Sequence, residues 1–321
     1  MLDEAGSHSW NARTTAEEIL ANHNLAEKLI VITGGSGGIG LAAAQAFARA
    51  GADVVIGGRK PTKVEGAAQA IAACSRGGAV IAHELDLMAQ ASVCRFAGQI
   101  GALDRPVDVF LANAGIVDPL ERSLEGIEGG FVTSYVGHAI LASELQEQLT
   151  RRGGSRVVTV SSFGHHFSPI VFDDINFKRR EYRPFLSYGQ SKTASILLAV
   201  TLANSWRENG VDAFSLHPGT IVTEVARSLR REDFREAKQR GAVTPADQTK
   251  NLEQGASTSI WASIEPSLRG RGPLYLEDCQ VARVNDEPNL RSGVMQYAMD
   301  QENAKRLWAS TEQMFGRVIP L

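Results

Sequence analysis

Short apolar runs alternate with longer, helix-length stretches along most of this chain. The apolar runs cover residues 29–32, 53–57, 79–83, 107–112, 156–161, 211–216 and 273–276. Runs that are apolar throughout, rather than at every second position, are typical of strands buried on both faces of a parallel sheet. Helices between successive strands then cover both faces. The pattern therefore predicts an α/β fold with a doubly wound parallel sheet of about seven strands.

The ends of several helices follow from capping residues and helix breakers. Thr14-Thr15-Ala16-Glu17-Glu18 is typical of a capped entry into a short helix before the first strand. Pro61 suits the first position of a helix. The longer expected helices span 61–74, 127–149 and a stretch that carries Tyr188 and ends at Gly210.

The alternation of strands and helices is not interrupted by a linker, a repeat or a low-complexity segment. We therefore expect one catalytic domain rather than two, although the length alone allows two. The expected domain spans 28–288, with a helical extension at 1–27 and a helical tail at 289–321.

The first apolar run leads directly into Thr33-Gly34-Gly35-Ser36-Gly37-Gly38-Ile39-Gly40, and an alanine-rich helical stretch follows. Gly34 and Gly38 permit a tight turn and a close approach of the backbone to a pyrophosphate, while Gly40 lets the helix pack on the strand. The N-terminus of the helix offers N–H groups and its dipole to the anion. A glycine cluster alone is weak evidence, but between a buried strand and a helix it predicts a dinucleotide site in a Rossmann-like fold.

Tyr188 and Lys192 are four residues apart on a predicted helix, so their side chains share one face. A free tyrosine has a pKa near ~10 and exchanges protons poorly at neutral pH, whereas a cation beside it favours the phenolate. The spacing suits a general acid/base. Tyr-x3-Lys also occurs by chance on many helices, and the glycine turn upstream is what favours the catalytic interpretation.

Five motifs occur in the order found in short-chain dehydrogenase/reductases, which the chain resembles from about Thr14 to its last helix. They are Thr33-Gly34-x3-Gly38-Ile39-Gly40, Asn113-Ala114-Gly115, Ser161-Ser162, Tyr188-x3-Lys192 and Pro218-Gly219. The long insert between Ser162 and Tyr188 resembles the branch that holds retinol-dehydrogenase-like and protochlorophyllide-reductase-like oxidoreductases. The resemblance implies an NAD(P)-dependent enzyme that interconverts a carbonyl and an alcohol on a small molecule.

The same resemblance implies roles for individual residues. Ser162 holds the substrate carbonyl beside Tyr188, with Ser161 as the alternative. Asp86, with Leu87, contacts the adenine amino group, although spacing alone equally allows a helix N-cap at Asp86. The expected cofactor-binding residues are Gly34, Ser36, Gly38, Ile39, Gly40, Arg59, Asp86, Leu87, Asn113, Ala114, Gly115, Tyr188, Lys192, Pro218, Gly219, Ile221 and Thr223.

One position departs from the family pattern. Ser134, in Thr133-Ser134-Tyr135-Val136-Gly137-His138, stands where family members usually carry an asparagine. By resemblance that asparagine holds a water that links the catalytic lysine to solvent. A serine has one hydroxyl in place of an amide with separate donor and acceptor groups. A second water that fills the gap, slower catalysis or a specialised task would each be compatible with this change.

The end of the second apolar run indicates which nicotinamide cofactor is used. It reads Ile56-Gly57-Gly58-Arg59-Lys60, without the acid that an NAD-preferring site places there for the ribose 2′-OH. The Arg59 guanidinium suits a phosphate, and Ser36 adds a hydroxyl donor. The alternative is that Arg59 and Lys60 belong to a solvated loop. We expect NADP(H).

The insert also suggests the character of the substrate pocket. Phe163, Phe167, Tyr182 and Phe185 favour an apolar or aromatic ligand. His165-His166 is expected to line this pocket or to be structural rather than to bind a metal, because no third ligand has suitable spacing. The stretch 227–240, rich in charges of both signs, reads as a solvated helix, and by resemblance it belongs to a lid at about 222–250.

Composition excludes several classes of protein and partner. The net charge of −3, from 33 basic and 36 acidic residues, gives no electrostatic case for nucleic acid. Three widely spaced cysteines suit reduced thiols in the cytoplasm rather than disulfides or a zinc site. The start of the chain lacks the features of a signal peptide, and no apolar stretch is long enough to span a bilayer. Both a monomer and a homo-oligomer are compatible with the sequence.

Two other functions stay open at this point. The same site could reduce an imine or an activated C=C bond, as protochlorophyllide-reductase-like relatives suggest. A catalytically impaired NADP-binding protein is the second alternative, motivated by Ser134.

Overall fold

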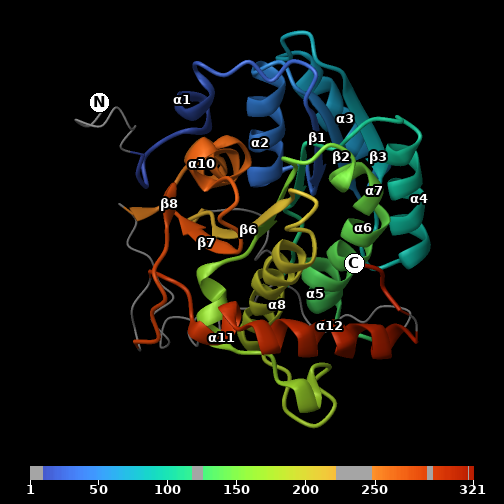
Figure 1. Ribbon diagram of the computed structural model, residues 1–321, viewed down its shortest axis with the longest axis vertical. Helices are drawn as coiled ribbons and strands as arrows, with labels where there is room; N and C mark the ends of the chain where they lie inside the picture. Colours follow the sequence, from blue (N-terminus) through green and yellow to red (C-terminus); the bar gives the residue numbers. More distant parts are fainter. Residues whose placement is uncertain (1–9, 118–125, 222–247, 288–291, 317) are drawn as a thin grey trace.

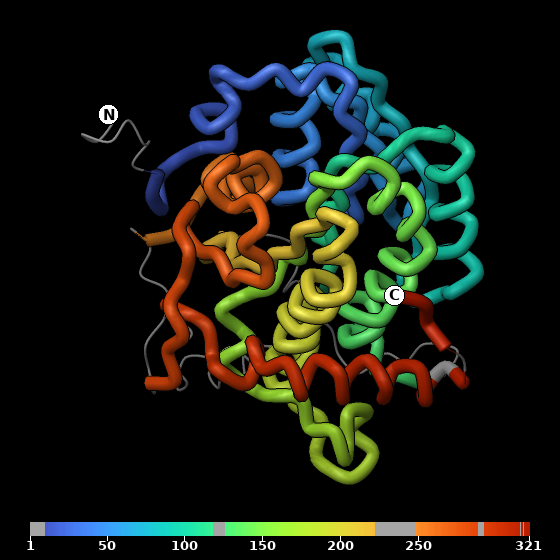
Figure 2. Tube along the Cα trace, viewed as in Figure 1, coloured from blue at the N-terminus to red at the C-terminus, as the bar shows by residue number. Residues whose placement is uncertain are grey.

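The computed structural model describes residues 10–117, 126–221, 248–287, 292–316 and 318–321 (Figures 1 and 2). Its centre is one eight-stranded sheet in the order β3-β2-β1-β4-β5-β6-β7-β8. The strands are β1 (Leu29–Thr33), β2 (Asp53–Gly58), β3 (Val80–Glu84), β4 (Val109–Ala112), β5 (Arg156–Val160), β6 (Asp212–His217), β7 (Leu274–Glu277) and β8 (Gln280–Val281). Strands β1 to β7 pair in parallel, and β8 pairs antiparallel with β7.

The predicted parallel sheet is confirmed, and its seven predicted strands lie within one or two residues of the observed ones. The addition is β8, which the sequence pattern could not show because a two-residue strand has no periodicity. It follows a tight turn in which Asp278 and Cys279 both have positive φ angles, of 52° and 57°.

Side chains of the central strand point alternately into two separate cores. Leu29 and Val31 of β1 pack in one core, whereas Ile30 and Ile32 pack in the other. The first core is covered by α4 (Gln90–Gly101), α5 (Gly129–Phe131), α6 (Gly137–Glu144), α8 (Pro184–Ser205) and α12 (Gln301–Phe315). The second is covered by α1 (Ala16–Leu20), α2 (Gly38–Arg49), α3 (Pro61–Ala72) and α10 (Leu252–Ile264). This arrangement is the expected doubly wound one, with helices on both faces of the sheet (Figure 1).

The helix expected at 127–149 is not continuous. It consists of α5, a π-helical turn η1 (Val132–Val136), α6 and α7 (Gln146–Thr150). Gly137 at the start of α6 packs closely on the loop after β3, because a Cβ atom there would lie 2.5 Å from the carbonyl oxygen of Leu87. A π turn widens the backbone locally and is frequent at functional sites.

The remaining predictions on helices have mixed outcomes. The capping box before β1 is confirmed, since Thr15 accepts the N–H of Glu18 and the Glu18 carboxylate accepts that of Thr15. The helix with Tyr188 starts at Pro184 and ends at Ser205, before Gly210. The sequence pattern did not delimit α4. The other short elements are η2 (Phe163–Phe167), η3 (Phe172–Asp174), η6 (Pro266–Leu268) and α11 (Gln296–Met299).

Helices in the described part of the chain do not combine the length and apolar character needed to cross a membrane.

Candidate active site

The carboxyl ends of β1, β4, β5 and β6 are neighbours in the sheet, and each is followed by one of the motifs. Because ligands of open α/β sheets bind at this edge, the order of the strands brings distant parts of the chain to one place. The motifs are Gly34 to Gly40 after β1, Asn113 to Gly115 after β4, Ser161-Ser162 after β5 and Pro218-Gly219 after β6.

The glycine turn has the geometry of a phosphate cradle. Gly34 and Gly38 have φ angles of +67° and +54°, which side chains rarely tolerate. A Cβ atom at Gly40 would lie 2.4 Å from the Asn113 amide nitrogen and 2.5 Å from the carbonyl oxygen of Gly34. No side chain in the described part of the chain caps α2 at Gly37, so the first N–H groups of the helix remain available to an anion. These residues fit the pyrophosphate of a dinucleotide.

The segment after β4 is fixed to the end of β1. The Asn113 side chain donates to the Thr33 carbonyl at 2.9 Å, and the N–H groups of Asn113 and Ala114 donate to Thr33 Oγ1. Since Thr33 Oγ1 accepts these two bonds, its own hydrogen donates to His138 Nε2 at 2.8 Å. His138 then donates from Nδ1 to the Ser134 carbonyl at 3.1 Å. The sequence analysis did not foresee this chain of contacts, because it connects residues that are about a hundred positions apart.

Tyr188 and Lys192 share one face of α8, as expected, and the Lys192 ammonium lies 5.7 Å from the centre of the Tyr188 ring. The ammonium is buried and donates to the Val160 carbonyl at 2.9 Å. Burial lowers the pKa of Lys192 to about 8. A Cβ atom at Gly115 would lie 2.8 Å from Lys192 Nζ, so only glycine at 115 leaves room beside the ammonium.

The expected lowering of the Tyr188 pKa by Lys192 is not seen. Burial raises the pKa of Tyr188, and a hydrogen bond with the Ser162 side chain partly opposes this shift. The ammonium faces the ring rather than the hydroxyl, and a buried phenolate loses hydration.

The two serines after β5 have different surroundings. The Ser161 hydroxyl is buried and donates to the Lys192 carbonyl at 2.8 Å. Ser162 Oγ accepts the Gly164 N–H at 3.0 Å and hydrogen-bonds Tyr188. Of the two alternatives, Ser162 is therefore the one beside the Tyr188 hydroxyl.

Ser134 lies in the π turn η1 and is only 3 % exposed. Its hydroxyl has no hydrogen-bond partner among the described residues. The Cβ position of Gly115 is 3.4 Å from this hydroxyl and 2.8 Å from Lys192 Nζ, so both polar atoms border the same small space. The Ser134 carbonyl already accepts from Ser195 Oγ and His138 Nδ1. An orphan hydroxyl next to a buried ammonium is a suitable place for a bridging water.

The residues expected to bind a second phosphate lie at and near the carboxyl end of β2. A Cβ atom at Gly58 would be 3.2 Å from Ser36 Oγ, and Arg59 follows in an exposed position. Lys63 was missed by the sequence analysis. Its ammonium lies 3.4 Å from the Cβ position of Gly37. The predicted start of α3 at Pro61 placed Lys63 in the first turn, so the sequence contained a signal for it.

Asp86 follows β3, and one of its carboxylate oxygens accepts the Met88 N–H at 3.0 Å. The alternative helix N-cap is wrong, because Ala89 occupies that position of α4. Leu87 is buried against Gly137.

The loop after β6 contains Pro218, Gly219 and Ile221. Gly219 has a φ angle of +94°, and a Cβ atom there would lie 2.6 Å from the Lys250 side chain. Ile221 forms a β-bridge with Lys250, whose buried ammonium pairs with Asp278 at 2.6 Å. Thr223, the charged stretch 227–240 and most of the expected lid lie outside the described residues.

Aromatic residues of the insert contact one another as expected for an apolar wall. Phe163 and Phe167 have ring centres 5.8 Å apart, as do Phe167 and Phe185. Tyr182 instead contacts Phe177, and its hydroxyl donates to the buried Glu128.

His165 is fully buried, so it does not line a pocket. His166 stacks on Phe163. The described His, Cys, Asp and Glu side chains form no group of three that could hold a metal ion.

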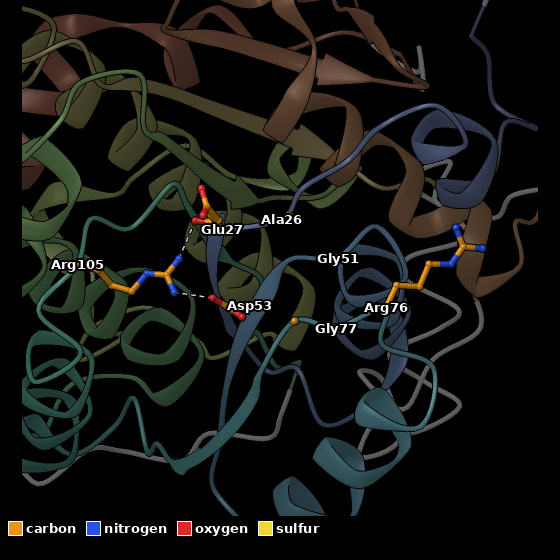
Figure 3. A pocket seen from close by; sticks show the side chains of 8 residues that line it. Ala26, Glu27, Gly51, Asp53, Arg76, Gly77 and Arg105 are labelled. Atoms are coloured by element: carbon orange, nitrogen blue, oxygen red, sulfur yellow. Dashed lines mark hydrogen bonds and ion pairs between the residues drawn. The ribbon is translucent and has the colours of Figure 1, made fainter.

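A hollow of about 550 Å³ lies at the amino edge of the sheet, opposite the motifs (Figure 3). It is lined by Ala26, Glu27, Gly51, Asp53, Arg76, Gly77, Gly78 and Arg105. The Arg105 guanidinium pairs with Asp53 at 2.5 Å and donates to the Glu27 carbonyl, while Arg76 points away from them. None of the proposed catalytic residues lines this hollow, so it is not the candidate active site.

The comparisons with known proteins agree on the family and the fold. Residues 28–233 match the family model of short chain dehydrogenases. A probable oxidoreductase of Streptomyces antibioticus is 39 % identical over 89 % of this chain and 96 % of its own length. A crystal structure of an uncharacterised Mycobacterium paratuberculosis protein has a TM-score of 0.71 and 28 % identity, covering 94 % of this chain and 98 % of the other.

A further relative has a cofactor bound. It is a Beutenbergia cavernae protein assigned as an NAD(P)-dependent gluconate 5-dehydrogenase, with NADP at low occupancy. Its TM-score is 0.62 and its identity 27 %, covering 79 % of this chain and 96 % of that one. The family model covers more than half of the chain, and the chain belongs to the short-chain dehydrogenase/reductase family of oxidoreductases.

Proposed function

We propose that this protein is an NADPH-dependent reductase that interconverts a carbonyl and an alcohol on an apolar or aromatic small molecule. The observation that carries the proposal is the convergence of Tyr188, Ser162 and Lys192 next to the glycine turn. A bound nicotinamide supplies the hydride for reduction and accepts it for oxidation.

The protein supplies binding and proton transfer. Tyr188 donates its hydroxyl proton to the developing alkoxide, since it is the acidic group that hydrogen-bonds the carbonyl-holding Ser162. Ser162 orients the carbonyl. The Lys192 ammonium binds the nicotinamide ribose, and from 5.7 Å its charge favours the phenolate that remains without lowering the pKa of Tyr188 below its usual value. A positive charge becomes more effective in a water-excluded site.

The lost proton must be replaced from solvent. The Ser134 hydroxyl and the Lys192 ammonium both lie beside Gly115, and in this proposal a water links them. In this proposal the hydroxyl of Ser134 performs the task that the resemblance assigns to asparagine.

The preference for NADP(H) rests on charge at the end of β2. The Ser36 hydroxyl lies beside Gly58, the Lys63 ammonium lies beside Gly37, and Arg59 directly follows β2, with no acid at this end of the strand to bind a free 2′-OH. The remaining expected contacts come from Gly34, Gly38, Ile39, Gly40, Asp86, Leu87, Asn113, Ala114, Pro218, Gly219 and Ile221, with Thr223 as a prediction from the resemblance.

The first experiment is titration of the protein with NADPH and with NADH. We expect NADPH to bind at least tenfold more tightly. Arg59→Ala removes a charge-assisted hydrogen bond of about 1.5–3 kcal/mol and should weaken NADPH binding by roughly ten- to a hundredfold. The affinity of Arg59→Ala for NADH should stay within about twofold of the wild type. Arg151→Ala is the control, because its guanidinium pairs with exposed acids elsewhere, and its nucleotide affinity should also stay within about twofold. Equal affinity of the wild type for both nucleotides would refute the cofactor assignment.

The second experiment is turnover with NADPH on a panel of aromatic and aliphatic ketones, enones and imines. Turnover of ketones supports the proposal, whereas turnover of imines or enones alone would replace it with one of the alternative reductions. The orphan hydroxyl of Ser134 favours one further candidate, a catalytically impaired NADP-binding protein. Tight NADPH binding without turnover across the panel would support that candidate. The cytoplasmic location stays a prediction from the cysteines.

A further inference from the structure

His165 is one of the most buried polar residues of the protein, yet it takes no part in the proposed chemistry. It lies on η2, three residues after Ser162, and its ring contacts three separate elements. The ring is 5.2 Å from that of Tyr275 on β7 and 4.2 Å from that of His166. Each of its nitrogens has a backbone partner.

The two partners fix the tautomer of the imidazole. Nδ1 lies 2.7 Å from the Ser162 carbonyl oxygen, which can only accept, so Nδ1 carries the hydrogen. Nε2 lies 3.2 Å from the Met295 backbone N–H, which can only donate, so Nε2 is unprotonated. A protonated ring could not accept from Met295.

The electrostatic surroundings keep this ring neutral. The titratable groups that face it are His166, His217, Tyr275 and Tyr297. Burial lowers the pKa of His165 well below its usual value, and the neighbouring His166 and His217 lower it further. The neutral form with both backbone bonds is therefore the form present throughout the ordinary working range of pH.

Through these contacts His165 fixes Ser162. The Ser162 carbonyl accepts from both the backbone N–H and the ring of His165, at 3.1 and 2.7 Å. The Ser162 hydroxyl accepts the Gly164 N–H, so it too depends on the shape of η2. These hydrogen bonds fix the position of Ser162 in the turn after β5.

The other side of His165 binds a segment near the C-terminus. Besides the Met295 N–H, the Tyr297 hydroxyl donates to the His165 carbonyl at 2.6 Å. His166 Nε2 donates to the Gly293 carbonyl at 3.1 Å. Residues 293–297 are therefore docked on η2 by three contacts with the histidine pair, about 130 positions away in the sequence.

We propose that His165 is a positioning residue that holds Ser162 in its catalytic orientation and makes the segment 293–297 a structural part of the active site. The proposal rests on the proposed function, in which Ser162 orients the carbonyl and Tyr188 exchanges the proton. In this role the histidine pair neither binds a metal nor forms the wall of the pocket.

Two substitutions at His165 test the roles of the two ring nitrogens separately. The amide of His165→Asn reaches the position of Nδ1 and can still donate to the Ser162 carbonyl, whereas the amide of His165→Gln reaches that of Nε2. We expect H165Q to lower kcat roughly tenfold or more, the effect of about one hydrogen bond of 1.4 kcal/mol, and H165N to lower it about threefold or less. NADPH affinity should stay within about twofold in both variants.

The pH profile gives a readout that a merely structural role would not change. The Ser162 hydrogen bond opposes the rise in the Tyr188 pKa, so displacement of Ser162 should raise this pKa further. The rising limb of the pH–rate profile for alcohol oxidation should then move to higher pH. We expect this shift in H165Q, whereas the limb of H165N should stay at its wild-type position. Equal losses of kcat in both variants with an unmoved limb would overturn the proposal, as would an H165Q enzyme indistinguishable from the wild type.

A backbone variant covers the case in which the histidine variants do not fold. Met295 has a φ angle of −66°, which proline adopts, so Met295→Pro deletes the N–H donor to Nε2 and also presses the proline ring against the imidazole. We expect a loss in kcat of roughly three- to tenfold at unchanged NADPH affinity, and an unaltered kcat would contradict the proposal. Tyr188→Phe is measured in parallel. If it retains turnover, the proposed function itself fails, whatever the variants of His165 do.

Discussion

Tyr188 is the only proposed acid/base of the site, and three substitutions around it should have distinct effects. Tyr188→Phe keeps the ring packing and deletes the proton, so kcat should fall at least about a thousandfold while NADPH binding persists. Lys192→Ala should lower both kcat and NADPH affinity, because the ammonium stabilises the phenolate and binds the ribose. Ser162→Ala should lower kcat less than Tyr188→Phe. Stopped-flow turnover and nucleotide titration distinguish these patterns, and a Tyr188→Phe enzyme with substantial turnover would remove Tyr188 from its role.

Ser134 allows a second test at the scale of one residue. Its buried hydroxyl has no partner among the described residues, so Ser134→Ala should leave the free energy of unfolding within about 0.5 kcal/mol of the wild type or raise it. If the hydroxyl holds a relay water, kcat should nevertheless fall. Ser134→Asn should preserve or raise kcat. An Asn variant that folds, binds NADPH and loses nearly all turnover would show that serine serves another purpose, such as substrate fit.

A substitution at the start of α2 tests how closely this helix packs on β1 at the site. A methyl group at Gly40 would collide with the Gly34 carbonyl and with Asn113, so Gly40→Ala must separate α2 from β1. We expect it to destabilise the fold by several kcal/mol or to abolish nucleotide binding. Gly66, in the middle of α3, has no described atom within 4 Å of its Cβ position and is a matched control. Gly66→Ala should raise the free energy of unfolding by about 0.5–1 kcal/mol, measured by urea denaturation. Equal behaviour of the two variants would contradict this account.

Most strands and the edge that carries the site could be predicted from the sequence, because β1, β4 and β5 are buried at every position and are therefore mostly apolar. The π turn at η1 could not, since it accompanies the contact of Gly137 with Leu87. Nor could the role of His165, because its partner Met295 is 130 residues away. Local sequence determines the elements, whereas their mutual contacts determine how each polar group is used.

The whole molecule should lose stability in mild acid because it buries neutral histidines. Burial lowers the pKa of His138 and His217 to about 4, and that of His165 well below 6.5. The unfolded chain takes up these protons near pH 6.5, so stability is full above that pH and falls as pH decreases toward 4. At pH 5 the loss is about 2 kcal/mol for each of His138 and His217. The raised pKa values of Glu128 and Glu277 act in the opposite direction and reduce the net effect.

Urea denaturation at pH 7 and pH 5 measures this difference. Replacing His217 by Asn should remove part of the pH dependence, because the asparagine does not titrate, whereas the same substitution at the exposed His23 should not. A pH dependence of the free energy of unfolding that is the same in the wild type and in the His217 variant would contradict this account of His217.

The order of strands in the sheet also bears on how a nascent chain behaves. Strand β1 lies between β2, which follows it closely, and β4, which is about eighty residues further along. Until Val109–Ala112 has left the ribosome, one edge of a mostly apolar strand offers unpaired N–H and C=O groups to any neighbouring chain. Fragments that end between β3 and β4 should therefore form aggregates, and a chaperone that shields this edge would matter most during that interval of synthesis.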